Sequence, residues 1–148
     1  MAFIPKDAKW YVAQIVVEFT VAGDPRNAVH INYLLVRADS PSEAYEKALR
    51  LGSDHETTYL NPDMKQVKAR FHGLRDLNVV YEDLAHGAEL LYEEKVALNQ
   101  EEIGQLVRPI ESLAVFKGIQ KSEGPDYSSG EVVREAKRLL ESSGTNGE

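Results

Sequence analysis

The sequence predicts a small α+β domain with a four-stranded, mainly antiparallel sheet in the order β-β-α-β-β, one helix packed on a face of the sheet, and further helices toward the C-terminus. Three observations predict this class. Residues 10–21 and 29–38 alternate in the manner of strands and are separated by the turn signal Gly-Asp-Pro-Arg-Asn at 23–27. Residues 41–51 have helical spacing and a sharply marked start. Residues 131–140 carry a separate amphipathic stripe.

The first two strands are expected to form an antiparallel hairpin with a longer loop. In residues 10–21 the odd positions are apolar, and they are expected to be buried because alternate side chains share one face of a strand. The even positions include Gln14 and Glu18 and are expected on the outer face. In the second strand, His30 and Asn32 are expected on the solvent face.

The helix predicted at residues 41–51 begins at a capping box, Ser40-Pro41-Ser42-Glu43. The Ser40 hydroxyl and the Glu43 carboxylate would bind backbone N–H groups that the first turn leaves unpaired. Gly52 stands where a left-handed C-terminal cap is expected. One apolar stripe is expected to face the sheet: Ala44, Tyr45, Ala48 and Leu49.

Two further strands are predicted in the middle of the chain. The third begins near Val67, after the turn at Asn61-Pro62-Asp63, and continues to Tyr81 past a bulge at Gly73. The fourth is predicted at residues 88–92, where apolar and polar residues alternate.

The C-terminal part is predicted to contain two helices and a linker. A short helix is expected between Asn99, which starts a second capping pattern, and Pro109. Residues 117–130 are rich in Gly, Pro and Ser without periodicity. The predicted organisation is therefore one α+β domain at 1–116, a linker at 117–130, and an amphipathic helix with its tail at 131–148.

Composition predicts a soluble cytoplasmic protein. The 148 residues include no cysteine, which excludes disulfide frameworks, zinc ribbons, iron–sulfur clusters and thiol nucleophiles. The N-terminus lacks the pattern of a secretory signal, and the longest apolar window, residues 12–21, is too short to span a bilayer. The net charge of −7 disfavours broad attraction to nucleic acid and suits a basic partner.

Specific motifs for cofactors are missing from the sequence. The four histidines lack the spacing of metal-ligand pairs, and no glycine-rich phosphate loop or nucleophile elbow occurs, so no cofactor or metal is predicted. The one basic stretch is interpreted as a solvated sheet face rather than a nucleic-acid platform, because Phe71 falls on its opposite face. Its members are Lys65, Lys68, Arg70 and Arg75, and acidic residues of the fourth strand are expected to pair with them across the sheet.

Several segments resemble the bacterial family described as domain of unknown function 4288 (DUF4288). They are Trp10-Tyr11, Ser40-Pro-Ser-Glu-Ala44-Tyr45-Glu-Lys-Ala48, Tyr59-Leu60-Asn61-Pro62, Phe71-His-Gly73-Leu-Arg-Asp76-Leu77 and Gly87-Ala-Glu89-Leu90. The resemblance covers residues 9–95, approximately. It implies a small bacterial cytoplasmic α+β domain, and it implies no particular reaction or ligand.

The favoured hypothesis is a non-catalytic protein-binding or regulatory domain, such as an inhibitor or immunity-type protein, or a protein that self-associates. Trp10 is expected on the outer face of the sheet, where an aromatic side chain favours contact with a partner. The helix at 131–140 is expected to pack either near Trp10 or on a partner chain, because its aligned apolar residues would otherwise be exposed. That stripe consists of Val132, Val133, Ala136, Leu139 and Leu140.

Two alternatives stay open. The first is a small-molecule hydrolase or other enzyme with an acid–base site near His72, Asp76, His86 and Glu89. Convergence of these four side chains in one concave pocket would favour it. The second is a nucleic-acid-associated protein.

Overall fold

The computed structural model describes residues 7–118 and 123–144. The chain divides into two compact units, the sheet unit, Met1–Leu91 with Gly124–Glu148, and the second unit, Tyr92–Glu123. The sheet unit contains β1 (Trp10–Val21), β2 (Asn27–Arg37), α1 (Pro41–Ser53), β3 (Thr57–Leu60), β4 (Gln66–Val79) and α3 (Gly130–Gly144). The second unit contains α2 (Gln100–Leu106) and two 3-10 turns, η1 (Ile110–Ser112) and η2 (Ala114–Phe116).

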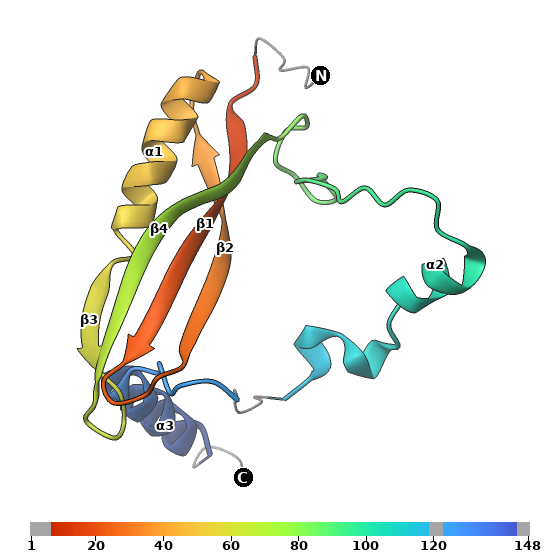
Figure 1. The fold of residues 1–148 in the computed structure, drawn as a ribbon. Helices are drawn as coiled ribbons and strands as arrows, with labels where there is room; N and C mark the ends of the chain where they lie inside the picture. The colour runs from red at the N-terminus through yellow and green to blue at the C-terminus, as the bar shows by residue number, and fades with distance from the viewer. Residues whose placement is uncertain (1–6, 119–122, 145–148) are drawn as a thin grey trace. The chain divides into compact units, whose positions relative to one another are not determined.

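The sheet unit has the predicted fold class. Its four strands lie in the order β2-β1-β4-β3, and every neighbouring pair is antiparallel. The chain order of strands and helix is β-β-α-β-β, as predicted, and α1 lies along one face of the sheet (Figure 1). We call the face that α1 covers the inner face and the opposite one the outer face.

The inner face is built on the odd-numbered residues of β1. Ile15 and Val17 are 0% and 1% exposed, because each has a strand on both sides and a covering layer above. The prediction that this face is buried is confirmed. One core cluster joins the start of β1 to α1 through Tyr11, Ala13, Val36, Ala38, Ala44 and Ala48. A second cluster continues along the sheet through Ile15, Val17 and Ala69, with Phe19, Leu34, Phe71 and Leu74 packed against it.

The start of α1 follows the predicted cap. The Glu43 backbone N–H donates to the Ser40 hydroxyl oxygen at 3.2 Å. The Glu43 carboxylate accepts from the backbone N–H of Asp39 at 3.3 Å, one residue earlier than the predicted partner. Ala44 and Ala48 are fully buried against the sheet. Their small side chains let the helix backbone approach the strands closely.

The prediction for Gly52 is wrong in its mechanism. Gly52 lies within α1, which continues to Ser53 and is capped by Asp54 in a right-handed conformation. A Cβ atom on Gly52 would lie 2.3 Å from the Cε1 atom of Phe71. Glycine is therefore required by the close approach of the Phe71 ring to the helix and not by a left-handed turn.

The prediction for the fourth strand at residues 88–92 is also wrong. This segment has no strand structure, and Leu90 and Tyr92 are 45% and 74% exposed. Residues 88–92 have no neighbouring strand in the described part of the chain with which to pair, so their alternating apolar side chains have no sheet to pack on. The acidic residues around it therefore do not pair across the sheet with the basic stretch as expected. The missing strand is β3, a four-residue strand directly after α1 that pairs Tyr59 with Val67 of β4.

The prediction for β2 assigned the wrong face. His30 and Asn32 lie on the inner face, opposite Val17 and Ile15 of β1, and both are half-buried. The odd-numbered residues of β2 lie on the outer face instead. Apolar residues lie on both faces of β2, so the sequence pattern alone does not show which face is buried. The length of the β1–β2 loop sets the register with β1, and this register determines the buried face.

The predicted bulge in β4 is confirmed. The register between β1 and β4 shifts between Gln14 and Ile15 and again between Val16 and Val17. Gly73, opposite Val16, has a φ of 142°, which L side chains rarely adopt. The irregularity brings both halves of a 14-residue strand into register with β1.

Part of the predicted linker is packed against the sheet. Pro125 is fully buried. The Tyr127 ring centroid lies 5.1 Å from that of Phe19 and 5.0 Å from that of His30. The Tyr59 hydroxyl donates to the Tyr127 carbonyl. The segment 124–129 thus covers the part of the inner face that α1 leaves open.

The predicted division at 1–116, 117–130 and 131–148 stays a prediction. Residues 1–6, 119–122 and 145–148 lie outside the described residues. The predicted helices do form. α2 begins with a capping box in which the Glu102 N–H donates to the Asn99 side chain at 2.8 Å, and α3 extends beyond its predicted bounds at both ends.

We predict that Val17→Ala lowers the free energy of unfolding by about 1–4 kcal/mol, because the substitution leaves a cavity in the inner-face core. Ile15→Ala should do the same. The matched control is Val29→Ala, whose side chain is 54% exposed and should cost far less. Urea denaturation of dilute protein measures each change, and equal midpoints for Val17→Ala and Val29→Ala would contradict the assignment of the core.

We also predict that Gly52→Ala destabilises the protein although alanine favours a helix by about 1 kcal/mol. The new methyl group would overlap the Phe71 ring, and overpacking of this kind costs about 1–3 kcal/mol. Gly104→Ala in α2 is the control, since its Cβ would meet nothing within 4 Å. A Gly52→Ala protein that is as stable as the wild type in urea denaturation would show that Phe71 moves away at no cost.

Candidate functional site

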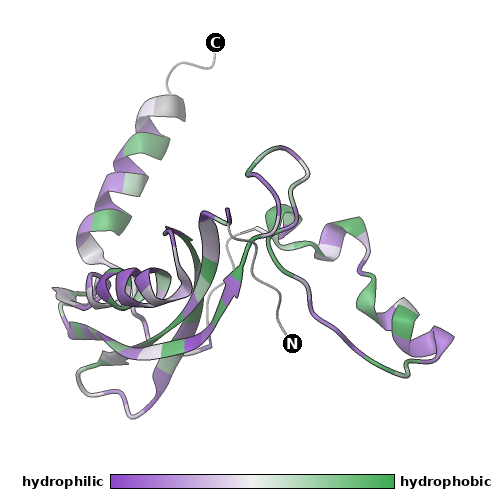
Figure 2. Ribbon diagram, turned by 90° about the horizontal axis from the view of Figure 1, so that it is seen from above, coloured by the Kyte–Doolittle hydropathy of each residue, from purple (hydrophilic) through white to green (hydrophobic). Residues whose placement is uncertain are grey.

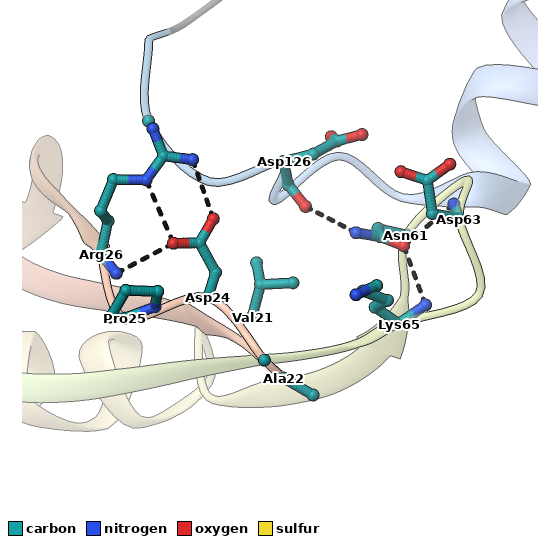
Figure 3. Close-up of a pocket in the computed structure, with 11 residues that line it drawn as sticks. Val21, Ala22, Asp24, Pro25, Arg26, Asn61, Asp63, Lys65 and Asp126 are labelled. Atoms are coloured by element: carbon teal, nitrogen blue, oxygen red, sulfur yellow. Dashed lines mark hydrogen bonds and ion pairs between the residues drawn. The ribbon is translucent and has the colours of Figure 1, made fainter.

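A polar pocket lies at the end of the sheet where the β1–β2 and β3–β4 turns meet the C-terminal segment (Figure 3). Its volume is about 550 Å³. The three contributing segments are residues 21–26, residues 61–65, and Gly124 with Asp126. The sequence predicted the first two as turns and did not predict that they share a pocket with Gly124 and Asp126, far along the chain.

Asn61 holds this end of the sheet together. It is 2% exposed, and its side-chain oxygen accepts the backbone N–H groups of Asp63 and Lys65 at 3.0 and 2.9 Å. Its side-chain nitrogen donates to the Asp126 carbonyl at 3.1 Å (Figure 3). Asn61 therefore shapes the β3–β4 turn and anchors the C-terminal segment, which is a structural role.

The charged pair in the pocket is Asp24 with Arg26. The guanidinium donates to both carboxylate oxygens, at 3.1 Å from Nε and 2.9 Å from the terminal nitrogen, and the Arg26 backbone N–H donates at 3.0 Å (Figure 3). These hydrogen bonds lower the pKa of Asp24 to about 2, with a smaller contribution from the charge of Lys65. Asp24 is thus held in its charged form.

The pocket combines three aspartates with two cations, and one of each, Asp24 and Arg26, bind each other. Asp126 accepts the N–H and hydroxyl groups of Ser128 in the same segment. Within the described part of the chain, no group of three or more His, Asp or Glu side chains could hold a metal ion. The arrangement closes the end of the sheet and supplies no candidate nucleophile or acid–base pair.

The alternative catalytic residues are not brought together. His72 donates from Nε2 to the Glu18 carboxylate at 2.9 Å on the outer face, and hydrogen bonds from Asn27 and His72 lower the pKa of Glu18. Asp76 lies four residues further along β4, roughly 13 Å at the rise of a strand. His86 and Glu89 follow in irregular chain and are exposed. Among the described residues, no hydrogen bond or ion pair joins any two of these four side chains.

The members of the basic stretch also have separate roles. Arg75 donates to the Gln14 side chain at 2.7 Å and to the Tyr33 hydroxyl at 2.6 Å on the outer face. Lys65 lines the polar pocket. Lys68 and Arg70 lie on the outer face of β4, opposite Thr20 and Glu18 of β1.

The predicted partner-binding residues lie at two ends of the sheet unit. Trp10 is half-buried at the start of β1, with the Arg37 guanidinium 5.9 Å from its ring centroid. α3 begins at the other end, where Tyr59 and Leu60 line a groove of about 430 Å³ with its first turns. Of the two alternatives predicted for the C-terminal helix, packing near Trp10 does not occur, because the packed segment 124–129 starts the helix at the far end, and packing on a partner chain stays a prediction.

The apolar stripe of α3 is largely exposed. Figure 2 shows apolar residues recurring along this helix. Val133 is half-buried in the groove beside β3. The large members beyond it, Val132, Leu139 and Leu140, are 65%, 61% and 70% exposed, and Ala136 is exposed as well. We call these five residues the α3 stripe.

A second apolar surface was missed by the sequence analysis because the face of β2 was assigned the wrong way round. We call it the β2 stripe, and it consists of Val29, Ile31, Tyr33 and Leu35, which are 54%, 37%, 50% and 45% exposed. All four side chains lie on the outer face of a strand at the edge of the sheet.

None of the described helices has the length and apolar character needed to cross a membrane. A family model described as Domain of unknown function (DUF4288) matches residues 10–92, more than half of the chain. No curated protein and no solved structure matches the chain.

We predict that Arg26→Gln raises the pKa of Asp24 from about 2 toward its ordinary value of 3.8, because the hydrogen bonds from Arg26 are the largest cause of the shift. The wild-type pair stabilises the fold fully above pH 3.8, and this contribution is lost as the pH falls through about 2. Carboxyl carbon shifts in an NMR titration measure the pKa. An unchanged Asp24 midpoint in the variant would assign the shift to Lys65 instead.

Proposed function

Because the chain belongs to the DUF4288 family, whose description states no activity, we propose a function from its surfaces: a non-catalytic protein-binding domain of the bacterial cytoplasm that regulates its partner. The observation that carries the proposal is the exposed α3 stripe on an anchored helix. The binding mode it fits is an amphipathic helix that lays its apolar side into a groove of another protein.

The exposure of the α3 stripe is unusual for a helix that serves only its own fold. Most helical stability in proteins comes from packing of the apolar side, and an isolated helix of 15 residues is marginal in water. Here the N-terminal turns of α3 border the groove beside β3, while Leu139 and Leu140 further along are 61% and 70% exposed. A partner groove that receives Val132, Leu139 and Leu140 would supply the missing packing.

α3 is nevertheless held in place at its start. Gly130 lies so close to the Asn61 carbonyl that a Cβ would be 3.2 Å from its oxygen. The preceding segment is fixed by buried Pro125 and by the stacking of Tyr127 on the sheet. An element anchored in this way loses less conformational entropy on binding than a free peptide would.

The charge of the chain supports a basic partner. The net charge of −7 would speed encounter with a positively charged protein, and this steering weakens as salt is added. α3 itself is balanced, with Glu131, Glu135 and Glu141 against Arg134, Lys137 and Arg138. The acidic chain would attract a basic partner from a distance, and α3 would then bind it through apolar contact. This combination suits an inhibitor or immunity-type domain.

We predict that the double substitution Leu139→Gln and Leu140→Gln abolishes capture of a specific partner by the full-length protein. Glutamine keeps a high helix propensity, so the change removes apolar surface without unfolding α3. The control is Glu141→Gln, on the opposite side of the helix, which should bind as the wild type does. The partner captured by the wild type and the control is identified by mass spectrometry and then titrated in purified form by calorimetry.

The expected result is at least a tenfold loss of affinity for the double variant and none for the control. Equal capture by all three proteins would overturn the role of α3. Turnover of a small molecule by the wild type, abolished by His72→Ala, would overturn the non-catalytic function.

A further inference from the structure

β2 is an edge strand whose free side is unprotected. It pairs with β1 on one side, and no strand of the described residues pairs with its other side. Exposed edges are usually protected by charges, proline, bulges or short length. β2 has 11 residues and contains no proline and no bulge against β1, and its only formal charge is Arg37 at its end.

The direction of the free backbone groups follows from the register with β1. The Ala38 N–H donates to the Lys9 carbonyl at 2.9 Å, and antiparallel strands alternate hydrogen-bonded and non-hydrogen-bonded pairs. The even-numbered residues of β2 therefore bind β1, and the odd-numbered residues direct their N–H and C=O groups to the open edge. Among the described residues, the Arg37 carbonyl at the end of the strand already accepts a hydrogen bond, from the Lys47 side chain at 2.7 Å.

We propose that two copies of this chain associate by antiparallel pairing of β2 with β2, about a two-fold axis at Asn32, so that the two four-stranded sheets become one continuous sheet. The β2 stripes of the two copies then adjoin on the outer face. This inference concerns a different surface from the α3 stripe and does not depend on the proposed function.

The residues of β2 are self-complementary in this register. Asn32 is the middle residue of the strand, so an axis there pairs all 11 residues. Ile31 then lies opposite Tyr33, and Val29 lies opposite Leu35. Asn27 lies opposite Arg37, so no like charges meet. Moving the axis to Tyr33 would instead place Val29 against Arg37 and leave Asn27 without a partner.

Asn32 itself is the second, independent observation. It is half-buried on the inner face, opposite Ile15, where His30 is the other polar side chain of β2, and its side-chain amide makes no hydrogen bond among the described residues. At the two-fold axis the amides of both copies would face each other. An amide carries donors and an acceptor, so two identical ones satisfy each other.

The size of this contact indicates a weak dimer. Eleven residues from each copy are about half of the roughly 20–30 residues a side in a standard interface. We therefore expect a reversible dimer populated at roughly 10–100 µM protein. Such an equilibrium depends on concentration and is visible by sedimentation.

The first test is sedimentation equilibrium of the full-length protein over a range of concentrations. The expected mass rises from 16.6 kDa toward twice that value. Ile31→Lys, and independently Val29→Lys, should remove the dimer, since each puts a charge into the paired stripe, and circular dichroism verifies that each variant is folded. Leu60→Lys is the matched control on the other edge strand, with a side chain 46% exposed, and it should leave the dimer unchanged.

The second test determines the register of the β2–β2 pairing by disulfide cross-linking. Because the chain contains no cysteine, any disulfide must form at the introduced residue. Asn32→Cys should form a disulfide-linked dimer under mild oxidation, since non-hydrogen-bonded pairs have Cα atoms about 4.5 Å apart, within the range of disulfides. His30→Cys should not, because its two copies would lie about 13 Å apart. A protein monomeric up to several hundred micromolar, a dimer that survives both lysine variants, or cross-linking at position 30 but not at 32 would each overturn the proposal.

Discussion

The structure depends on the burial of one face of one strand. β1 has hydrogen-bonded neighbours on both sides, and Ile15 and Val17 in its middle are almost completely inaccessible. Because alternate side chains of β1 share that face, the registers of β2 and β4 determine which of their residues join the core. The bulges in β4 and the wrongly predicted face of β2 both follow from fitting long strands to this central one.

Two covers close the inner face, and they come from different parts of the chain. α1 covers the half near Tyr11 with small side chains, Ala44 and Ala48. The segment 124–129 covers the other half through Tyr127, whose ring packs against Phe19 and meets the His30 ring edge-on. The family match ends at residue 92, so the second cover lies outside it. In this chain, residues beyond the matched region complete the core.

Sequence reasoning succeeded where one local rule decided the outcome. The apolar odd-numbered positions of β1 and the Ser40 cap of α1 each depend on a few adjacent residues. It failed where the outcome depended on distant partners. The alternation at 88–92 has no strand beside it, β3 is too short to show a pattern, and the pocket around Asn61 joins three separated segments. For β2, apolar residues on both faces made the two possible orientations indistinguishable without the register.

The two apolar stripes lie on different elements of the sheet unit, one on α3 and one on the edge strand β2, so that both could act in one assembly. α3 starts beside β3, and β2 is the edge strand furthest from β3. Pairing through β2 would therefore leave both α3 stripes of a dimer accessible. Two linked copies of a weak binding helix gain affinity through effective concentration when the partner offers two grooves at a matching distance. A partner with two such grooves would then bind the dimer more tightly than a monomer, by the gain in effective concentration.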